Sequence, residues 1–352
     1  MMFERNAPEQ HDTLDRIPEP SENPVLCGHD QAAGALAAAY RAGKLPHALL
    51  FSGPRGIGKA TLAFHFAYHV LTQPDHAAAA GKLVAPDPRS PHFRQMAAGS
   101  HPSVLHLTRP ANDRNGGGFK SAITVDEVRK VSRFTSHTAH DGGYRFVIVD
   151  PADDMNPNAA NALLKNLEEP PARTVFMLIA HSAGRLLPTI RSRCQTVRLS
   201  PLAAADLYAV LEKFEIALPA NGEGRAALAA AAAGSPRTAI LMTDYGGLEV
   251  GATLDRLIRA PNPPGVEAHR LAEAVAAKDR AIQFGMFNDR LLDVLAEAAG
   301  EAARSGDIER AGRISGAWQE MRIAIGEADT YNLDRKQHAL TMILRLHDTL
   351  RM

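Results

Sequence analysis

The first half of the chain alternates short apolar runs with longer segments in which apolar residues recur at helical spacing. Runs of this length and continuity are typical of strands that are buried on both faces of a sheet. They lie at His47–Ser52, Ser103–Leu107, Tyr144–Asp150 and Thr174–Ala180. The intervening segments predict helices at Gly28–Gly43, Ala60–Leu71, Thr124–Phe134 and from Pro157 onward. Strands that alternate with helices indicate a parallel α/β sheet.

The helix that starts at Pro157 has both boundaries marked in the sequence. Asn156 is a residue type that caps helices, and proline is favoured at the first helical position. Pro170 and Pro171 end the helix, because proline cannot continue its hydrogen-bonding pattern. One stripe of the helix is apolar and is expected to pack on the sheet; its members are Ala160, Leu163, Leu164 and Leu167.

Beyond about Leu199 the pattern changes to helices alone. They are predicted at Leu202–Phe214, at Glu223–Ala233, after Gly234-Ser235-Pro236-Arg237, and throughout Val266–Met352. We therefore predict a loose N-terminal arm over residues 1–24, an α/β domain over 25–200, a small helical domain over 201–245 and a helical C-terminal domain over 246–352. Residues 73–120 are the least regular part of the α/β domain, because prolines interrupt them.

Composition limits the class of protein. Of 352 residues, 39 are Lys or Arg and 39 are Asp or Glu, so no global basic field indicates a nucleic-acid binder. The two cysteines, Cys27 and Cys194, exclude a disulfide framework and a four-cysteine zinc site. Cys194 is expected to be a small buried residue at the start of a strand. No run of about 18 apolar residues and no apolar signal core is present, so the cytoplasm is the expected location.

A glycine-rich segment separates the first predicted strand from the helix after it. Its sequence, Gly53-Pro54-Arg55-Gly56-Ile57-Gly58-Lys59-Ala60-Thr61, has the spacing of a phosphate loop. In such a loop, backbone N–H groups surround the phosphates, the lysine reaches the β- and γ-phosphates, and the next hydroxyl holds Mg²⁺. We therefore expect nucleotide contacts from Gly53, Gly56, Gly58 and Lys59, with Thr61 and Asp150 on the metal side. The alternative is a glycine-rich turn that binds nothing.

Two features indicate that this site is degenerate. Ala60 occupies the metal position without a hydroxyl, and Thr61 is one residue late, which on a helix turns its side chain by about 100°. The third strand ends in Asp150-Pro151, whereas ATP-hydrolysing enzymes of this kind have a glutamate that activates water. Asp153 and Asp154 are acidic residues nearby. They either replace the missing glutamate or are solvated charges of the loop. No cofactor is therefore expected to be required, and ATP, ADP or Mg²⁺ would bind weakly at most.

Several motifs occur together in a specific combination. The block Asn161–Pro171, NALLKNLEEPP, is followed by Arg191-Ser192-Arg193-Cys194. Further motifs are GKLPHA at residues 43–48, the phosphate loop, His101-Pro102 and Gly234-Ser235-Pro236. With these, the chain from about Val25 to Arg237 resembles the bacterial clamp-loader subunits of the AAA+ superfamily. The tail from Tyr331, YNLDRKQ, resembles the family's collar domain more weakly.

The resemblance implies an AAA+ phosphate-loop domain, a helical lid domain and an all-α collar that serves oligomerisation. The family contains ATP-hydrolysing subunits and a stator-like subunit, and the damaged phosphate loop and strand end make this chain similar to the latter. Relatives usually carry a four-cysteine zinc module after the phosphate loop. Thr72–His101 contains no cysteine here, so zinc is not expected, and His76, His92 and His101 are expected to be surface residues.

The resemblance also implies a place in a complex. Clamp-loader ATPase subunits, a delta subunit and this chain would form a hetero-pentamer of the DNA polymerase III holoenzyme, which loads a sliding clamp onto primed DNA in replication. Arg193 would be a trans arginine finger on a neighbour's nucleotide, and Arg237 has the position of the lid arginine. The alternatives are that Arg193 is a surface arginine paired with a carboxylate and Arg237 a helix-surface residue. Whether the chain is itself an enzyme stays open.

Two other functions stay open. The chain could be an active AAA+ ATPase whose Mg²⁺ is held by Thr61 or by water. It could also bind DNA locally through a basic stripe, although Asp126 and Glu127 dilute that stripe and a solvated helix face is the alternative. The residues of this stripe are Arg129, Lys130, Arg133, His137 and His140.

Overall fold

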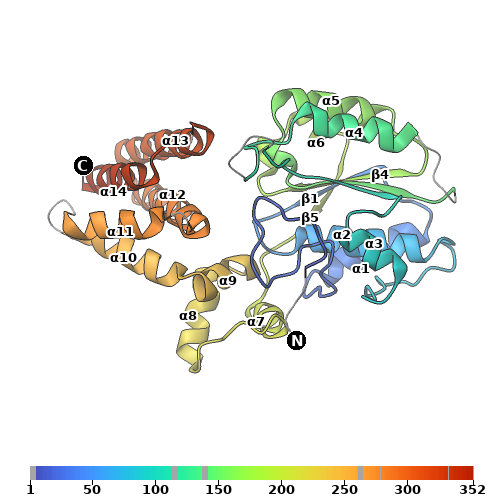
Figure 1. Cartoon of the computed structure of the whole chain (residues 1–352), viewed down its shortest axis with the longest axis horizontal. Helices are drawn as coiled ribbons and strands as arrows, with labels where there is room; N and C mark the ends of the chain where they lie inside the picture. The colour runs from blue at the N-terminus through green and yellow to red at the C-terminus, as the bar shows by residue number, and fades with distance from the viewer. Residues whose placement is uncertain are drawn as a thin grey trace. The chain divides into compact units, whose positions relative to one another are not determined.

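The computed structural model describes residues 5–112, 118–136, 142–260, 265–277, 279–331 and 333–351. The chain divides into two compact units, Met1–Ala239 and Ile240–Met352 (Figure 1). A sheet with helices on both faces forms most of the first unit, and helices form the second. Within the described ranges, no helix combines the length and apolarity that a membrane span requires.

The first unit is built on a parallel sheet of five strands in the order β2-β3-β4-β1-β5. The strands are β1 (Ala48–Ser52), β2 (Val104–Leu107), β3 (Arg145–Val149), β4 (Thr174–Ala180) and β5 (Gln195–Arg198). This arrangement confirms the predicted α/β fold class with a parallel sheet. Because the carboxyl ends of parallel strands share one edge, the segments after β1, β3 and β4 become neighbours there.

Helices cover both faces of this sheet (Figure 1). One face carries α1 (Asp30–Arg41), α2 (Lys59–Thr72) and α3 (Pro91–Ala97); the other carries α4 (Val125–Ser136), α5 (Pro157–Glu168) and α6 (Pro188–Arg191). Side chains alternate along a strand, so each strand supplies both cores. Leu49 and Phe51 pack in the core with α2, whereas Leu50 packs in the core with α5.

The predicted helices and strands of the α/β domain are present, with small differences at their ends. Helix α5 has the predicted cap: the Asn156 side chain accepts a hydrogen bond from the Ala159 N–H at 2.9 Å. Helix α3 lies in the segment that the sequence pattern leaves irregular. Ser90 caps it by accepting the Phe93 N–H at 3.1 Å, and Phe93 and Met96 are buried. Its 7 residues are too few to show a helical period.

The N-terminal segment corrects the prediction of a loose arm. Leu14 is buried, and so are the carboxylate-bearing residues Glu19 and Glu22. Glu22 accepts hydrogen bonds from the N–H groups of Asn6 at 2.8 Å and Ala7 at 3.1 Å. The segment is therefore folded by bonds between its polar side chains and its own backbone, which leave no hydrophobic period in the sequence.

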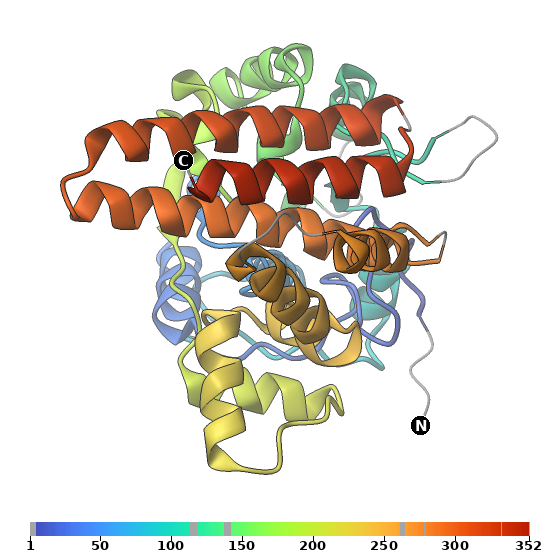
Figure 2. The ribbon, with the colours of Figure 1, turned by 90° about the vertical axis from the view of Figure 1, so that its left-hand side faces the viewer.

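Three helices follow the sheet: α7 (Ala204–Lys213), α8 (Gly222–Ala232) and α9 (Pro236–Asp244). They match the helices predicted for the lid, and the division between the two units falls within α9. The second unit contains α10 (Gly247–Arg259), α11 (Val266–Ala276), α12 (Ala281–Arg304), α13 (Ile308–Tyr331) and α14 (Arg335–Arg351). Figure 2 shows α12, α13 and α14 side by side, around a core that includes Phe287, Leu291 and Leu346. The predicted turn at Asn262–Pro264 lies outside the described residues.

Candidate nucleotide site and arginine site

The phosphate loop connects β1 to α2 and is contacted directly by Gly234-Ser235-Pro236-Arg237, here called the lid motif. Ser235 Oγ donates a hydrogen bond to the Arg55 carbonyl at 3.0 Å, and the Arg237 N–H donates one to the Gly56 carbonyl at 3.3 Å. Gly56 has a φ of 75°, and a Cβ there would lie 2.4 Å from the Arg237 Cβ. Glycine is therefore required at position 56 both by backbone conformation and by the close approach of the lid.

Lys59 is the first residue of α2 and is only 3% exposed. Its Nζ donates hydrogen bonds to the carbonyls of Gly53 at 2.8 Å and Pro54 at 2.5 Å. Burial lowers the pKa of Lys59 to about 8, although the charges of Asp150 and Asp153 oppose that shift. The ammonium that a bound nucleotide would need is thus bonded to carbonyls of its own loop.

The metal side of the site is equally altered. Ala60 and Thr61 are both buried on α2, and only Thr61 has a hydroxyl. Asp150 directly follows β3, and burial raises its pKa to about 7, with the nearby Asp12 charge adding to the shift and Lys59 opposing it. A carboxyl group with such a pKa is partly protonated near neutral pH, so Mg²⁺ would have to displace its proton.

Asp153 and Asp154, the candidate replacements for a catalytic glutamate, have structural partners. Asp153 accepts the N–H groups of His181 and Ser182, both at 3.1 Å, just after β4. Asp154 pairs with the Arg109 guanidinium at 2.6 Å. Burial raises the pKa of Asp154, against the lowering effect of Arg109. Both carboxylates therefore hold the strand ends together, and neither is placed as a base by these contacts.

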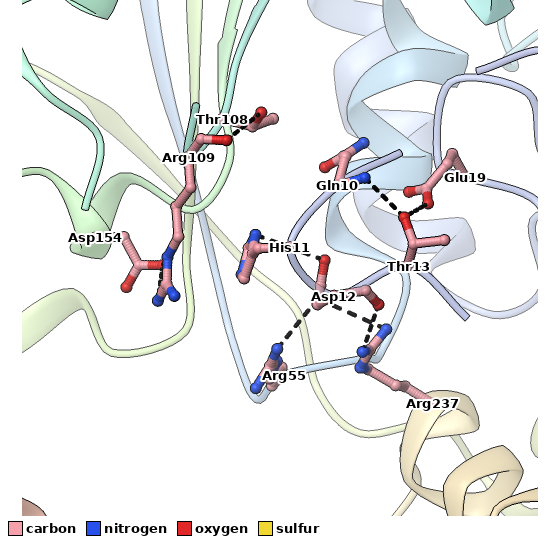
Figure 3. A network of polar contacts seen from close by, with 10 residues as sticks. All are labelled: Gln10, His11, Asp12, Thr13, Glu19, Arg55, Thr108, Arg109, Asp154 and Arg237. Carbon is pink, nitrogen blue, oxygen red and sulfur yellow. Dashed lines mark hydrogen bonds and ion pairs between the residues drawn. The ribbon is translucent and has the colours of Figure 1, made fainter. Parts of the chain in front are cut away.

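An acidic residue from the N-terminal segment enters the site, and sequence reasoning did not identify it (Figure 3). Asp12 Oδ2 lies 3.2 Å from Arg55 Nη2 and 3.6 Å from Arg237 Nη1. Arg237 Nη2 also donates to the Asp12 carbonyl at 2.5 Å. Burial would raise the pKa of Asp12, but the charges of Arg237 and Arg55 oppose it, and that pKa lies far below its usual range.

Two histidines lie near the same strand ends and were also missed by the sequence reasoning. His11 precedes Asp12, and His181 follows β4. Burial lowers the pKa of His11 to about 4 and that of His181 to about 3. Both rings are therefore neutral at physiological pH and add no positive charge toward a phosphate.

Arg193 lies on the turn between α6 and β5, with its side chain 34% exposed. Its Nη2 is 2.7 Å from Glu168 Oε1, at the end of α5, and its Nη1 donates to the Thr189 carbonyl at 2.9 Å. Cys194 is half-buried rather than buried, and burial raises the pKa of its thiol to about 11. That shift disfavours the thiolate, so Cys194 is not an activated nucleophile.

The residues present do not fit a bound Mg²⁺–nucleotide. The lysine is bonded to loop carbonyls, the metal position is an alanine, and a carboxylate lies between the two arginines that would meet phosphate. Among the described residues, no group of three or more His, Cys, Asp or Glu could hold a metal ion. His92 and His101 contact each other at 3.0 Å, and His101 is buried rather than at the surface as expected.

The basic stripe on α4 is largely neutralised where it is described. Arg129 pairs with Asp126 at 2.7 Å, and Lys130 pairs with Glu127 at 2.6 Å. His137 and His140 lie outside the described residues. Nothing in these contacts favours a DNA-binding surface over a solvated helix face.

Comparisons with known proteins agree on one family for this chain. The family model for DNA polymerase III, delta subunit, matches residues 28–203. A DNA polymerase III subunit delta' of Pseudomonas aeruginosa is 38% identical over 251 residues, which are 71% of this chain and 71% of that protein. One of Escherichia coli is 36% identical over 176 residues, 50% of this chain and 48% of that protein, so the match spans about half of that relative.

One solved structure that matches this chain is that of a DNA polymerase III gamma subunit-related protein from Thermotoga maritima. It is 16% identical, has a TM-score of 0.41, and the match covers 92% of this chain and 100% of that one.

Proposed function

The chain belongs to the DNA polymerase III delta subunit family, and from this premise we propose that it works as a delta'-type subunit of a bacterial clamp loader. In this role it joins clamp-loader ATPase subunits and a delta subunit in a cytoplasmic hetero-pentamer. The complex loads a sliding clamp onto primed DNA, and this chain contacts clamp and DNA as a member of the complex. One combination of features carries the proposal. The phosphate loop is closed because Lys59 is bonded to loop carbonyls, while Arg193, after α6, is exposed at the surface.

The chain itself is proposed to hydrolyse little or no ATP. Hydrolysis needs a metal ligand at position 60, a free lysine and a base after β3. Here these are Ala60, a Lys59 bonded to two loop carbonyls, and Pro151. For the chain to be an active ATPase subunit, other groups would have to supply the metal ligand, the free lysine and the base. Asp153 and Asp154 supply no such base, because their carboxylates are bonded to other partners.

Arg193 is proposed to act on the nucleotide of a neighbouring subunit. Its ion pair with Glu168 is open to solvent, with side-chain exposures of 34% and 49%, and such pairs contribute only about 0–1 kcal/mol. A phosphate offers more negative charge and accepts a bidentate guanidinium, so it can replace Glu168 as partner. In other systems an arginine supplied in trans accelerates phosphoryl transfer by about 10³–10⁵-fold.

The second unit is proposed to be the collar that joins the subunits. It exposes large apolar side chains, which commonly mark interaction surfaces when they gather in patches. The most exposed of them in the described part of this unit are Leu248, Val266, Ile308, Ile323, Tyr331 and Leu333.

The test is steady-state ATP hydrolysis by the reconstituted complex, with primed DNA and clamp present. Arg193→Ala should assemble normally and remove clamp-stimulated hydrolysis at one site, and Arg193→Lys should rescue poorly because an ammonium lacks the planar fork. Arg191→Ala, an exposed arginine two residues away, is the matched control. If Arg193→Ala hydrolyses ATP like the wild type in an intact complex, the trans role is wrong.

A further inference from the structure

The N-terminal segment forms a closed loop whose two ends are bonded together. Near its start, Arg5 Nη2 donates to the carbonyls of Leu14 at 2.6 Å and Ile17 at 3.0 Å. Near its end, Glu22 accepts the N–H groups of Asn6, Ala7 and Glu19. A carboxylate that accepts three backbone N–H groups fixes the local chain conformation strongly. The loop thus has a defined shape before its tip meets the rest of the domain.

The tip of this loop is a tight turn that presents Asp12. The Gln10 N–H donates to Thr13 Oγ1 at 2.7 Å, and the Thr13 N–H donates back to the Gln10 carbonyl at 3.2 Å. Thr13 Oγ1 also donates to Glu19, which ties the turn to the base of the loop (Figure 3). These hydrogen bonds fix the backbone of the turn, and the fixed backbone determines where the Asp12 carboxylate lies.

The partners of Asp12 come from two different parts of the nucleotide site. Arg55 belongs to the phosphate loop, and Arg237 belongs to the lid motif that contacts the same loop. One oxygen, Oδ2, approaches both guanidinium groups, at 3.2 and 3.6 Å. Two arginines that converge on one oxyanion are the arrangement that proteins use for phosphate groups.

We propose that the N-terminal loop is an intramolecular plug, in which the Asp12 carboxylate takes the place of a phosphate group between Arg55 and Arg237. The plug closes the degenerate site to nucleotides and inorganic phosphate. It also holds the lid motif against the phosphate loop, because Asp12 contacts an arginine from each. This role concerns the chain's own site. It does not depend on Arg193 or on assembly with other subunits.

Physical arguments favour the plug over a free anion. Asp12 is attached to the domain, so it competes at an effective concentration of about the millimolar range or above. It is largely desolvated, with a side chain 27% exposed, and Arg237 is 23% exposed. Removing the carboxylate would leave two like charges close together, and another oxyanion would relieve that repulsion.

The test uses the full chain with Asp12→Asn, which keeps the shape of the side chain and removes its charge. Inorganic phosphate and ADP without metal are the probes, and binding is measured by calorimetry and by the rise in Tm with ligand concentration. We expect Asp12→Asn to bind at least about tenfold more tightly than the wild type, equivalent to about 1.4 kcal/mol. Glu9→Gln removes an exposed charge from the same loop and should behave like the wild type.

A second substitution separates this site from adventitious binding. Arg237→Ala added to Asp12→Asn should abolish the new affinity, because the phosphate would lose one of its two guanidinium partners. Equal binding by Asp12→Asn and the wild type would overturn the proposal. So would tighter binding that survives the loss of Arg237.

A measurement on loop opening covers the case in which Asp12→Asn does not fold. In the otherwise wild-type chain, Arg55→Ala with Arg237→Ala should release the tip, so amide hydrogen exchange should rise at residues 10–13 while the sheet strands stay protected. Unchanged exchange at the tip in that variant would show that Asp12 is not held by the two arginines, and the plug would be wrong.

Discussion

At the scale of single residues, Arg193 combines a resting partner with an accessible position. Glu168 and the Thr189 carbonyl orient its guanidinium while leaving it 34% exposed. An arginine that must later contact a phosphate benefits from being oriented beforehand, because fewer rotamers are lost on contact. The ion pair with Glu168 is therefore compatible with Arg193 as a trans arginine finger and with Arg193 as a surface arginine paired with a carboxylate. The strength of this pair distinguishes the two interpretations.

We predict that Glu168→Gln changes the free energy of unfolding of the isolated chain by less than about 1 kcal/mol, because the ion pair is solvent-exposed. Urea denaturation measures this, with Glu169→Gln, the exposed neighbour, as control. A loss of several kcal/mol would mean that the pair holds the α5–α6 region together. Arg193 could then not leave Glu168 for a phosphate without cost to the fold.

Asp150 gives a pH-dependent prediction. Its pKa in the folded chain, about 7, is above the ordinary 3.8, so the folded state holds the proton more tightly than the unfolded state. The stability from protonated Asp150 is full below about pH 4 and is lost as the pH rises through 7. Asp150→Asn stays neutral, and relative to the wild type it should gain roughly 1–3 kcal/mol between about pH 4 and pH 8.

Urea denaturation across that pH range checks the prediction for Asp150. The carboxyl carbon of Asp150 should also titrate in NMR spectra with a midpoint near 7. A midpoint near the ordinary value of 3.8, or a stability difference independent of pH, would contradict it.

Part of the candidate site could be predicted from the sequence because its determinants are local. The glycines and Lys59 occur in one short motif between a strand and a helix, and the loss of the hydroxyl at Ala60 is visible at once. Asp12 could not be predicted, because its partners Arg55 and Arg237 are 43 and 225 residues away. No pattern in a polar, proline-containing segment specifies such long-range ion pairs.

At the scale of elements, α5 matters because it ends at Glu168, the ion-pair partner of Arg193. Asn156 caps it by accepting the Ala159 N–H at 2.9 Å. We predict that Asn156→Ala lowers the free energy of unfolding by about 1 kcal/mol, because an N–H at the helix start loses its acceptor. Asn158→Ala, an exposed position in the first turn, is the control and should be neutral or slightly stabilising. Equal effects of the two substitutions in urea denaturation would contradict the capping role.

The elements of the α/β domain were predictable to the extent that they are buried. The strands β1, β3 and β4 are almost wholly buried and therefore appear as continuous apolar runs. β5 is an edge strand with three exposed residues of four, so Gln195–Arg198 carries no such run. Helix α3 is too short for a period. What the sequence could not provide was the N-terminal loop, whose fold rests on hydrogen bonds rather than on apolar spacing.

At the scale of the whole molecule, each compact unit has its own hydrophobic core. Among the described residues, the two cores that flank the sheet contain no buried residue beyond Leu199, and the core of the second unit starts at Leu254. A unit that holds a complete core can fold without the rest of the chain. The sheet domain with its lid and the helical second unit can therefore be separated experimentally.

We predict that a chain ending at Tyr245, after helix α9, folds but does not assemble. Its circular dichroism and a cooperative urea transition should show an intact sheet domain, because both cores on the sheet are retained. Assembly should be lost, because the exposed apolar side chains proposed to meet the other subunits belong to the second unit. Size-exclusion chromatography with the partner subunits measures this, and full-length Arg193→Ala, which should still assemble, is the control. Co-elution of the truncated chain with its partners would place the main contacts in the first unit and would remove the proposed collar role from the second.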